Sequence, residues 1–125
     1  MPTTITYNFT ANVSGGPSLT LSDSVDVEAY DEIVVTIPPG SPTNVSVQPG
    51  SGGHLLIITA SDYAALTYTV DDVATVRTLD GPHILVGTGA VALLGDSQNE
   101  IAFTNGGSED ITVSILVGRD AIPIP

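Results

Sequence analysis

The chain has 125 residues, 42% of them hydrophobic, which is enough to form the core of one domain without disulfides or metals. Its formal net charge is −12 although only 13% of its residues are charged, because Arg77 and Arg119 are its only Lys or Arg side chains. Nucleic-acid and anionic-membrane binding both need several such residues, so this composition disfavours both, and the absence of cysteine excludes disulfides, thiolate metal sites and thiol catalysis.

The first residues, MPTTITYNFT, lack the positively charged segment and the apolar segment of a signal peptide. Apolar runs elsewhere are far shorter than the ~20 residues of a membrane-spanning helix. We therefore expect a protein that is made in the cytoplasm without a signal peptide. The Asn-x-Ser/Thr sequences at Asn8, Asn12 and Asn44 are then attributed to Thr- and Ser-rich strands.

Apolar and polar residues alternate with the period of a β-strand through most of the chain. The clearest case is the first: Ile5, Tyr7 and Phe9 alternate with Thr and Asn, and the pattern continues to Val13 before Gly15-Gly16-Pro17 ends it. We expect this segment to be a long, half-buried strand. Further strands are expected, in chain order, at 25–29, 33–37, 45–47, 54–60, 66–70, 75–79, 84–86, 91–94, 101–104 and 111–117.

Short strands at this spacing, separated by Gly, Pro and Asn, are typical of an all-β domain. The predicted fold is a single antiparallel β-sandwich, jelly roll or closed barrel of about 8–10 strands over residues 1–125. No stretch keeps a clean helical period, and residues 61–66 allow one helical turn at most. Neither an internal repeat nor a change in composition indicates a second domain.

The two ends of the chain are the candidate contact elements. Pro123 and Pro125 force an extended tail over residues 119–125, and Ile122 and Ile124 are unusual side chains for such a tail on a free monomer. This tail can dock on its own sandwich, reach a neighbouring subunit or stay disordered, and residues 1–4 can form a second arm. The predicted interface residues are Pro2, Thr3, Thr4, Arg119, Ile122, Pro123 and Ile124.

The segment 84–92, ILVGTGAVA, fits the GxGxxA pattern of dinucleotide-binding loops, with Glu109 and Asp110 further along the chain. Such a loop must open a helix of a βαβ unit, whose N-terminus holds the pyrophosphate. Only Ala90 to Leu94 follow before Gly95, which is too short for that helix. We therefore expect a glycine hairpin turn at 87–89 and no bound cofactor.

Acidic residues gather at Asp23, Asp26, Glu28, Asp31 and Glu32, and a second oxygen-rich loop spans 96–100. Calcium needs several oxygens that converge on one point, and no DxDxDG-type loop enforces convergence here. A solvated outer face is the expected role of the first cluster, and no metal site is predicted.

His54 and His83 each follow a Gly-containing turn at the start of an apolar strand, and could pair as metal ligands or as an acid and a base. No motif links them, and no GxSxG sequence accompanies the nearby Ser51 and Ser61. A paired-carboxylate hydrolase would be expected to line a sugar site with aromatics, but Trp is absent and aromatic residues make up only 5% of the chain. The chain is therefore predicted not to be an enzyme.

The two arginines stand among fourteen carboxylates, so each is expected to find an acidic partner. That partner can lie in the same chain or in a neighbouring subunit. Arg119 directly precedes the tail, which makes it the better interface candidate of the two.

In size, all-β pattern, Met1-Pro2 start and Pro-containing tail, the chain resembles the small decoration or cement proteins of tailed-phage capsids. The resemblance is one of general type. It implies a homo-oligomer, commonly a trimer, that is made in the host cytoplasm and sits on the virion surface, where it clamps neighbouring coat subunits. Residues 2–6 and the tail would be the clamping elements, acting by strand addition and by docking of Ile122 and Ile124.

A non-catalytic β-sandwich module that binds a ligand or a surface through its loops is the alternative function. A small hydrolase or isomerase of jelly-roll type is the third. Loss of an activity on replacing His54 or His83 would favour the enzyme, whereas loss of assembly on removing residues 121–125 would favour the structural protein.

Overall fold

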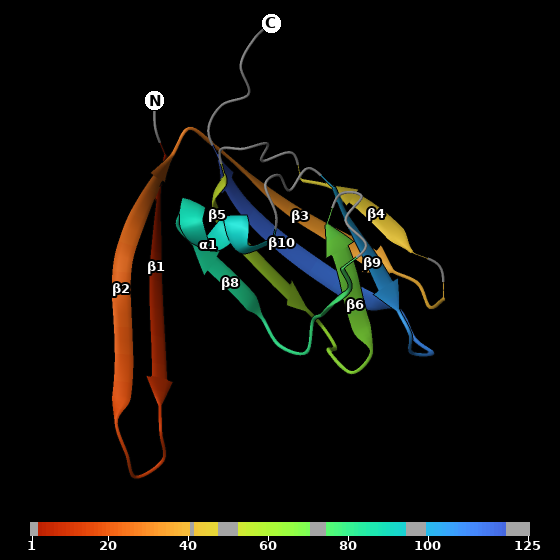
Figure 1. The fold of residues 1–125 in the computed structure, drawn as a ribbon, viewed down its shortest axis with the longest axis horizontal. Helices are drawn as coiled ribbons and strands as arrows, with labels where there is room; N and C mark the ends of the chain where they lie inside the picture. Colours follow the sequence, from red (N-terminus) through yellow and green to blue (C-terminus); the bar gives the residue numbers. More distant parts are fainter. Residues whose placement is uncertain (1–2, 41, 48–52, 71–74, 95–99, 120–125) are drawn as a thin grey trace, which may run out of the picture.

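The computed structural model describes residues 3–40, 42–47, 53–70, 75–94 and 100–119, and it is all-β, as predicted (Figure 1). Two four-stranded sheets face each other, and a separate two-stranded hairpin stands beside them. The ordered elements are β1 (Thr3–Asn12), β2 (Ser18–Val27), β3 (Ala29–Ile37), β4 (Thr43–Ser46), β5 (Gly53–Ala60), β6 (Leu66–Val70), β7 (Arg77–Thr78), β8 (His83–Val86), α1 (Thr88–Val91), a 3-10 turn (Ala92–Leu94), β9 (Glu100–Asn105) and β10 (Ile111–Arg119).

Both sheets are antiparallel. Sheet I has the order β3-β10-β5-β8, and sheet II has the order β4-β9-β6-β7. Strand β10 lies inside sheet I, paired with β3 on one edge and with β5 on the other. Every second residue from Ile111 to Val117 is apolar and buried, so one side of this strand faces the core. The two sheets form a sandwich and not a closed barrel, so of the predicted architectures the barrel is wrong.

The core lies between the two sheets. Tyr68 and Phe103 of sheet II are the largest fully buried side chains, and their rings contact each other with centroids 5.7 Å apart. Leu56, Ile58 and Ile115 of sheet I belong to the same buried cluster. Burying each side chain of this size contributes roughly 1.5–3 kcal/mol, so this cluster is the main source of the sandwich's stability.

A buried asparagine holds the connection between β9 of sheet II and β10 of sheet I. The Asn105 side chain is fully buried, and its Nδ2 donates to the carbonyl oxygens of Ile37 at 3.1 Å and Glu109 at 2.6 Å. Its Oδ1 accepts a hydrogen bond from the Gly107 N–H at 2.9 Å. The turn at 105–107 is therefore held in place by hydrogen bonds of the Asn105 side chain.

The strand predicted at 91–94 is wrong, because these residues complete α1 and the 3-10 turn. Gly87, with φ +96°, turns the chain out of β8, and its carbonyl oxygen accepts the helical bond from the Val91 N–H at 3.0 Å. Among these residues Val91 is buried while Leu93 is 71% exposed. The segment is thus the end of α1 followed by a 3-10 turn, with Val91 buried. Periodicity alone does not distinguish a short apolar run of this kind from a strand.

Two other segments are shorter or less regular than predicted. Of the strand expected at 75–79, Arg77–Thr78 forms a strand opposite Tyr68 and Thr67, and the Leu79 N–H adds one hydrogen bond to the Leu66 carbonyl oxygen at 2.9 Å. The helical turn allowed at 61–66 is absent. A side-chain turn replaces it, in which Asp62 Oδ1 accepts a hydrogen bond from the Ala64 N–H at 2.9 Å.

Candidate functional interface

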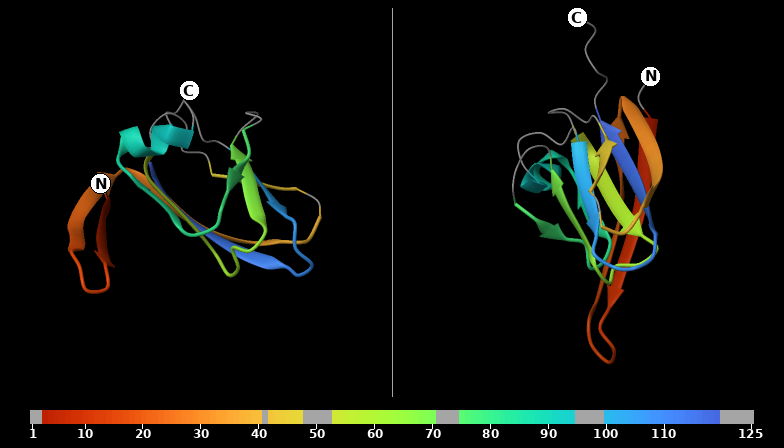
Figure 2. Two further views of the ribbon diagram at one scale, coloured as in Figure 1. Left: turned by 60° about the horizontal axis from the view of Figure 1, so that its bottom comes forward. Right: turned by 90° about the vertical axis from the view of Figure 1, so that its right-hand side faces the viewer.

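The hairpin of β1 and β2 is the part of the fold that projects furthest from the sandwich (Figure 2). The register runs from Thr3 opposite Val27 to Asn12 opposite Ser18. Within the described part of the chain, neither outer edge of this hairpin pairs with another strand. The hairpin therefore keeps two edges with free backbone groups, which are able to accept a further strand.

One side of the hairpin is apolar. Strand alternation and register place Ile5 opposite Val25, Phe9 opposite Leu21 and Ala11 opposite Leu19 on this side. We call this side, which consists of Ile5, Tyr7, Phe9, Ala11, Leu19, Leu21, Asp23 and Val25, the hairpin face. The opposite side is polar, and on it Thr4 donates a hydrogen bond to Asp26 and Ser22 donates one to Asn8.

The base of the hairpin packs against sheet I. A Cβ placed on Gly118 of β10 would lie 2.8 Å from Val27 Cγ1 and 2.9 Å from Ile5 Cδ1, so both side chains sit directly on that glycine. Leu55, opposite Gly118 on β5, is fully buried although it lies outside the core cluster between the sheets. The hairpin base thus forms a small second core on the outer side of sheet I.

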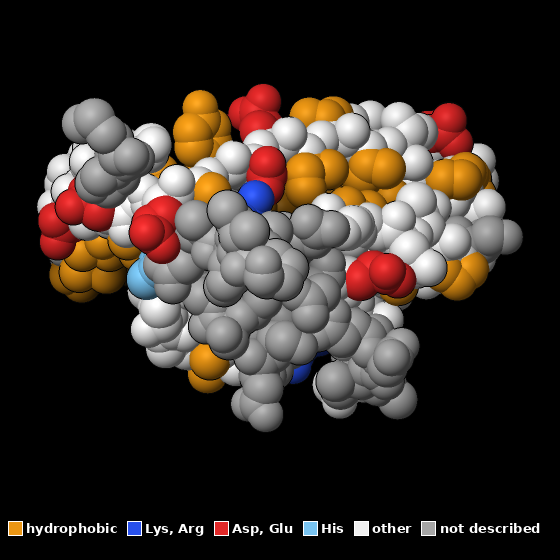
Figure 3. Space-filling model, turned by 90° about the horizontal axis from the view of Figure 1, so that it is seen from above, with side chains coloured by type: hydrophobic (Ala, Val, Ile, Leu, Met, Phe, Trp, Pro, Cys, Tyr) orange, Lys and Arg blue, Asp and Glu red, His pale blue; other side chains and the backbone are white. Residues whose placement is uncertain are grey.

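The outer half of the hairpin face is uncovered. Phe9 is 44% exposed, Leu21 49% and Leu19 65%, and Figure 3 shows hydrophobic side chains gathered at the hairpin end of the molecule. A long half-buried strand was predicted here, but only its first part is half-buried. Since an isolated two-stranded hairpin is marginally stable in water, an apolar face of this kind is expected to be covered in the functional state.

The predicted interface residues fall into three groups, the last of which is Arg119 alone. Thr3 and Thr4 lie in β1, opposite Val27 and Asp26 of β2. Pro2, Ile122, Pro123 and Ile124 lie outside the described residues, as do residues 120–125 in general.

Arg119, the third predicted contact, has an acidic partner in its own chain. Its Nη2 lies 3.0 Å and its Nε 3.3 Å from Asp31 Oδ2. The backbone of Arg119 also accepts a hydrogen bond from the Glu28 N–H at 3.1 Å. Arg119 therefore ties the start of β3 to the end of β10, where the hairpin joins the sandwich.

A hollow of about 380 Å³ opens beside Arg77 at the β8 end of the sandwich. Tyr68 OH lies 2.8 Å from His83 Nδ1 at its inner wall. Burial raises the pKa of the Tyr68 phenol above its usual 10.0, and the Arg77 charge opposes that rise. The lining residues are Tyr68, Arg77, Pro82, His83, Ile84, Leu85 and Leu93.

Arg77 contacts a backbone oxygen and no carboxylate in the part of the chain that the structure describes. Its Nη2 lies 3.4 Å from the Leu93 carbonyl oxygen, and no described Asp or Glu comes within 4 Å of it. A guanidinium beside an apolar hollow is able to bind an anionic group by charge-assisted hydrogen bonds.

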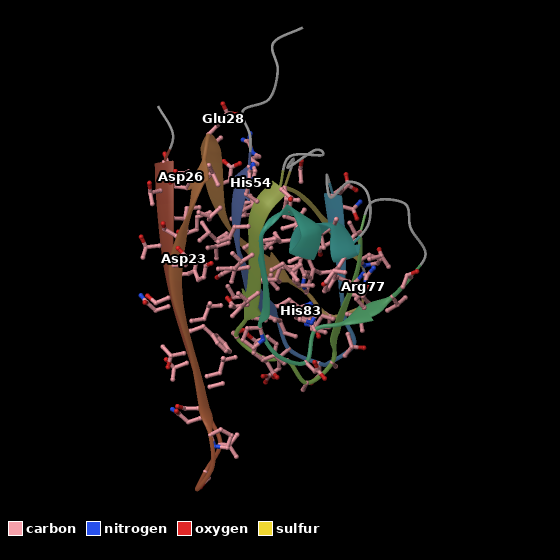
Figure 4. The ribbon with its side chains drawn as sticks, turned by 60° about the vertical axis from the view of Figure 1, so that its left-hand side comes forward. Asp23, Asp26, Glu28, His54, Arg77 and His83 are labelled. Atoms are coloured by element: carbon pink, nitrogen blue, oxygen red, sulfur yellow. The ribbon has the colours of Figure 1, made fainter. Side chains whose placement is uncertain are left out.

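The two histidines are not brought together. His83 lies opposite Ile58, whereas His54 stands four residues earlier on β5, a separation of about 13 Å at ~3.3 Å per residue. Figure 4 shows them at opposite ends of the strand pair.

The acidic residues do not converge on one point, since Asp23 and Asp26 occupy opposite sides of β2 and Asp31 pairs with Arg119. No group of three potential metal ligands occurs among the described residues.

The glycine hairpin turn predicted at 87–89 is wrong, because Gly87 leads into α1. That helix has four residues, and β8 pairs antiparallel with β5, so the βαβ context of a dinucleotide loop is missing from the described chain.

No described helix is long and apolar enough to cross a membrane. The chain matches none of the protein-family models, curated proteins or solved structures with which it was compared.

Proposed function

We propose that this protein is a structural, self-assembling protein, and that the hairpin face is one of its contact surfaces. The observation that carries the proposal is the exposure of Phe9, Leu19 and Leu21 on one side of a hairpin that stands apart from the sandwich. Sequence alternation and exposure together favour a contact role for the outer half of this side, because Phe9, Leu19 and Leu21 belong to neither buried core of their own chain.

Within this role, decoration of the outer surface of a virus shell is the specific function we propose, with a coat subunit as the second partner. The net charge of −12 supports it, since such a charge keeps an exterior protein soluble and limits non-specific association. The free edges of β1 and β2 suit strand addition to a neighbour. Removing residues 121–125 is expected to abolish attachment to the shell while leaving the sandwich folded.

A binding module is the alternative, and the hollow beside Arg77 favours it. In that case a small anionic group would sit between Arg77 and His83. Replacing Arg77 would then abolish ligand binding without changing the mass of the protein in solution.

Sedimentation velocity over a wide range of protein concentrations tests the proposal. We expect the wild-type chain to form oligomers and the variant Phe9→Ser/Leu21→Ser to sediment as a monomer. Thr10→Ser/Thr20→Ser is the matched control, because these residues form the next pair along the hairpin and face the polar side. A wild-type protein that stays monomeric at every concentration, alone and with shell subunits, would contradict the proposal.

A further inference from the structure

The hairpin face contains one carboxylate. Asp23 lies opposite Tyr7 and two residues from Leu21, so it stands among the exposed apolar side chains. It accepts a hydrogen bond from the Ser24 N–H at 2.8 Å, and no Arg of the described chain lies within ion-pair distance of it. A partner for this face would therefore have to be apolar and carry one positive charge.

A surface with these properties exists on the same protein. Ile84 is 46% exposed and Leu93 71%, and both line the hollow beside Arg77. We call Arg77, Ile84 and Leu93 the Arg77 patch. Because Arg119 is paired with Asp31, Arg77 is the guanidinium that has no carboxylate partner among the described residues.

The two surfaces cannot meet within one molecule in this fold. Figure 4 places Asp23 on the hairpin and Arg77 on the opposite side of the sandwich. The contact would therefore join two copies of the chain.

From this complementarity we propose that the hairpin face of one copy docks on the Arg77 patch of a second copy, with an ion pair between Asp23 and Arg77 at its centre. This inference rests on the proposed self-assembly and specifies its interface. Since the two surfaces differ, the contact is heterologous, and copies joined this way form a closed ring when the rotation between them closes. A trimeric ring is one such arrangement.

Charge reversal tests the ion pair. Asp23→Arg alone and Arg77→Asp alone should each weaken self-association by roughly 30-fold or more, because each places like charges at a desolvated contact. The double variant should recover most of the wild-type affinity. An equimolar mixture of the two single variants should form mixed pairs that neither variant forms alone, because the reversed hairpin of one fits the reversed patch of the other. In a ring with an odd number of copies one like-charge contact would remain, so the mixture is scored by these mixed pairs and not by closed rings.

Asp26→Arg is the matched control for these variants. It makes the same change in net charge on the same strand but on the polar side of the hairpin, so association should stay within about twofold of the wild type. Equal weakening by Asp26→Arg and Asp23→Arg would show that net charge, and not a specific pair, controls association.

A disulfide experiment tests the geometry independently, because the chain contains no cysteine of its own. On mixing under mild oxidation, a Leu21→Cys variant and a Leu93→Cys variant should form a mixed disulfide dimer faster than either variant alone. Thr20→Cys, on the polar side, replaces Leu21→Cys as the control and should form the mixed dimer slowly.

The possible results separate the inference from the function on which it rests. Oligomers that resist both charge reversals and give no preferred mixed disulfide would overturn this interface while leaving self-assembly intact. A wild-type chain that is monomeric at all concentrations would overturn both. Loss of assembly in the single variants with recovery in the double variant and in the mixture would establish the interface.

Discussion

Gly118 is the position at which the placement of the hairpin can be tested most simply. Its Cα lies under the side chains of Val27 and Ile5, with no room for a methyl group between them. Gly118→Ala would place a carbon 2.8 Å from Val27 Cγ1, far inside the usual contact distance of about 3.5–4.0 Å. The β-branched Val27 is stiff at χ1, so the hairpin base must move away from sheet I.

Overpacking of this kind costs about 1–3 kcal/mol of the free energy of unfolding. The substitution also reduces the entropy of the unfolded chain, which stabilises by roughly 0.4–1 kcal/mol. Gly81→Ala provides the control for this second effect, because a Cβ there meets nothing within 4 Å and no positive φ opposes it. The difference between the two variants therefore isolates the contact at the hairpin base.

Thermal and urea unfolding of both variants provide the measurement. For a chain of 125 residues, 1 kcal/mol corresponds to roughly 4 °C in Tm, so Gly118→Ala should melt about 4–12 °C below Gly81→Ala. Adding Ile5→Val, which removes one of the two crowding carbons, should recover part of this loss. Equal stability of Gly118→Ala and Gly81→Ala would refute the packing of the hairpin base on sheet I.

Three further predictions concern the sandwich. Asn105→Ala should lower the free energy of unfolding in urea by about 1–3 kcal/mol, because it leaves two carbonyl oxygens without their hydrogen-bond donor. Asn44 is exposed, so Asn44→Ala is the control and should leave the free energy of unfolding unchanged. The raised pKa of Tyr68 means that its contribution to stability is full below pH 10.0 and is lost as the pH rises through the folded-state pKa, so Tyr68→Phe should unfold with a flatter pH dependence above pH 10.0. Arg119→Gln should cost only about 0.2–1 kcal/mol, and less in high salt, because its partner Asp31 is 46% exposed; a loss above about 2 kcal/mol would show a larger structural role.

The sandwich follows closely from the alternation of residues in the sequence. The strand predicted at 111–117 is confirmed, and its alternate residues Ile111, Val113, Ile115 and Val117 are all buried. A strand with one apolar side has a single register that buries that side, which is why alternation predicts it well. The segment 91–94 has no such constraint, since a short apolar run packs equally well as a strand or as a helical turn.

Of the two strands of the hairpin, the sequence predicted β1 well and β2 only in part. The first strand was evident from its alternation, but β2 begins at Ser18, well before the predicted start at 25. Residues 18–24 contain three serines and an aspartate, so the alternation of Leu19 and Leu21 is a weak strand signal that pairing with β1 completes. Alternation identified an apolar side at Phe9 but carried no information on whether another element covers it.

The Arg77 patch was beyond sequence reasoning. Arg77, Ile84 and Leu93 come from three separate elements, and only the packing of α1 and β7 at the end of the sandwich brings them to one hollow. The scarcity of basic residues did draw attention to Arg77, but it predicted an acidic partner, and no described carboxylate lies within ion-pair distance of this side chain.

The most direct test of the assembly mechanism uses the two phenylalanines of the chain, Phe9 on the hairpin face and Phe103 in the core. Labelling with 4-fluorophenylalanine gives one ¹⁹F NMR signal from each, so Phe103 serves as the internal reference. As protein concentration rises, the Phe9 signal should shift and lose its sensitivity to replacement of H₂O by D₂O, while the Phe103 signal stays constant. A Phe9 signal that remains solvent-sensitive and unshifted at every concentration would contradict assembly through the hairpin face.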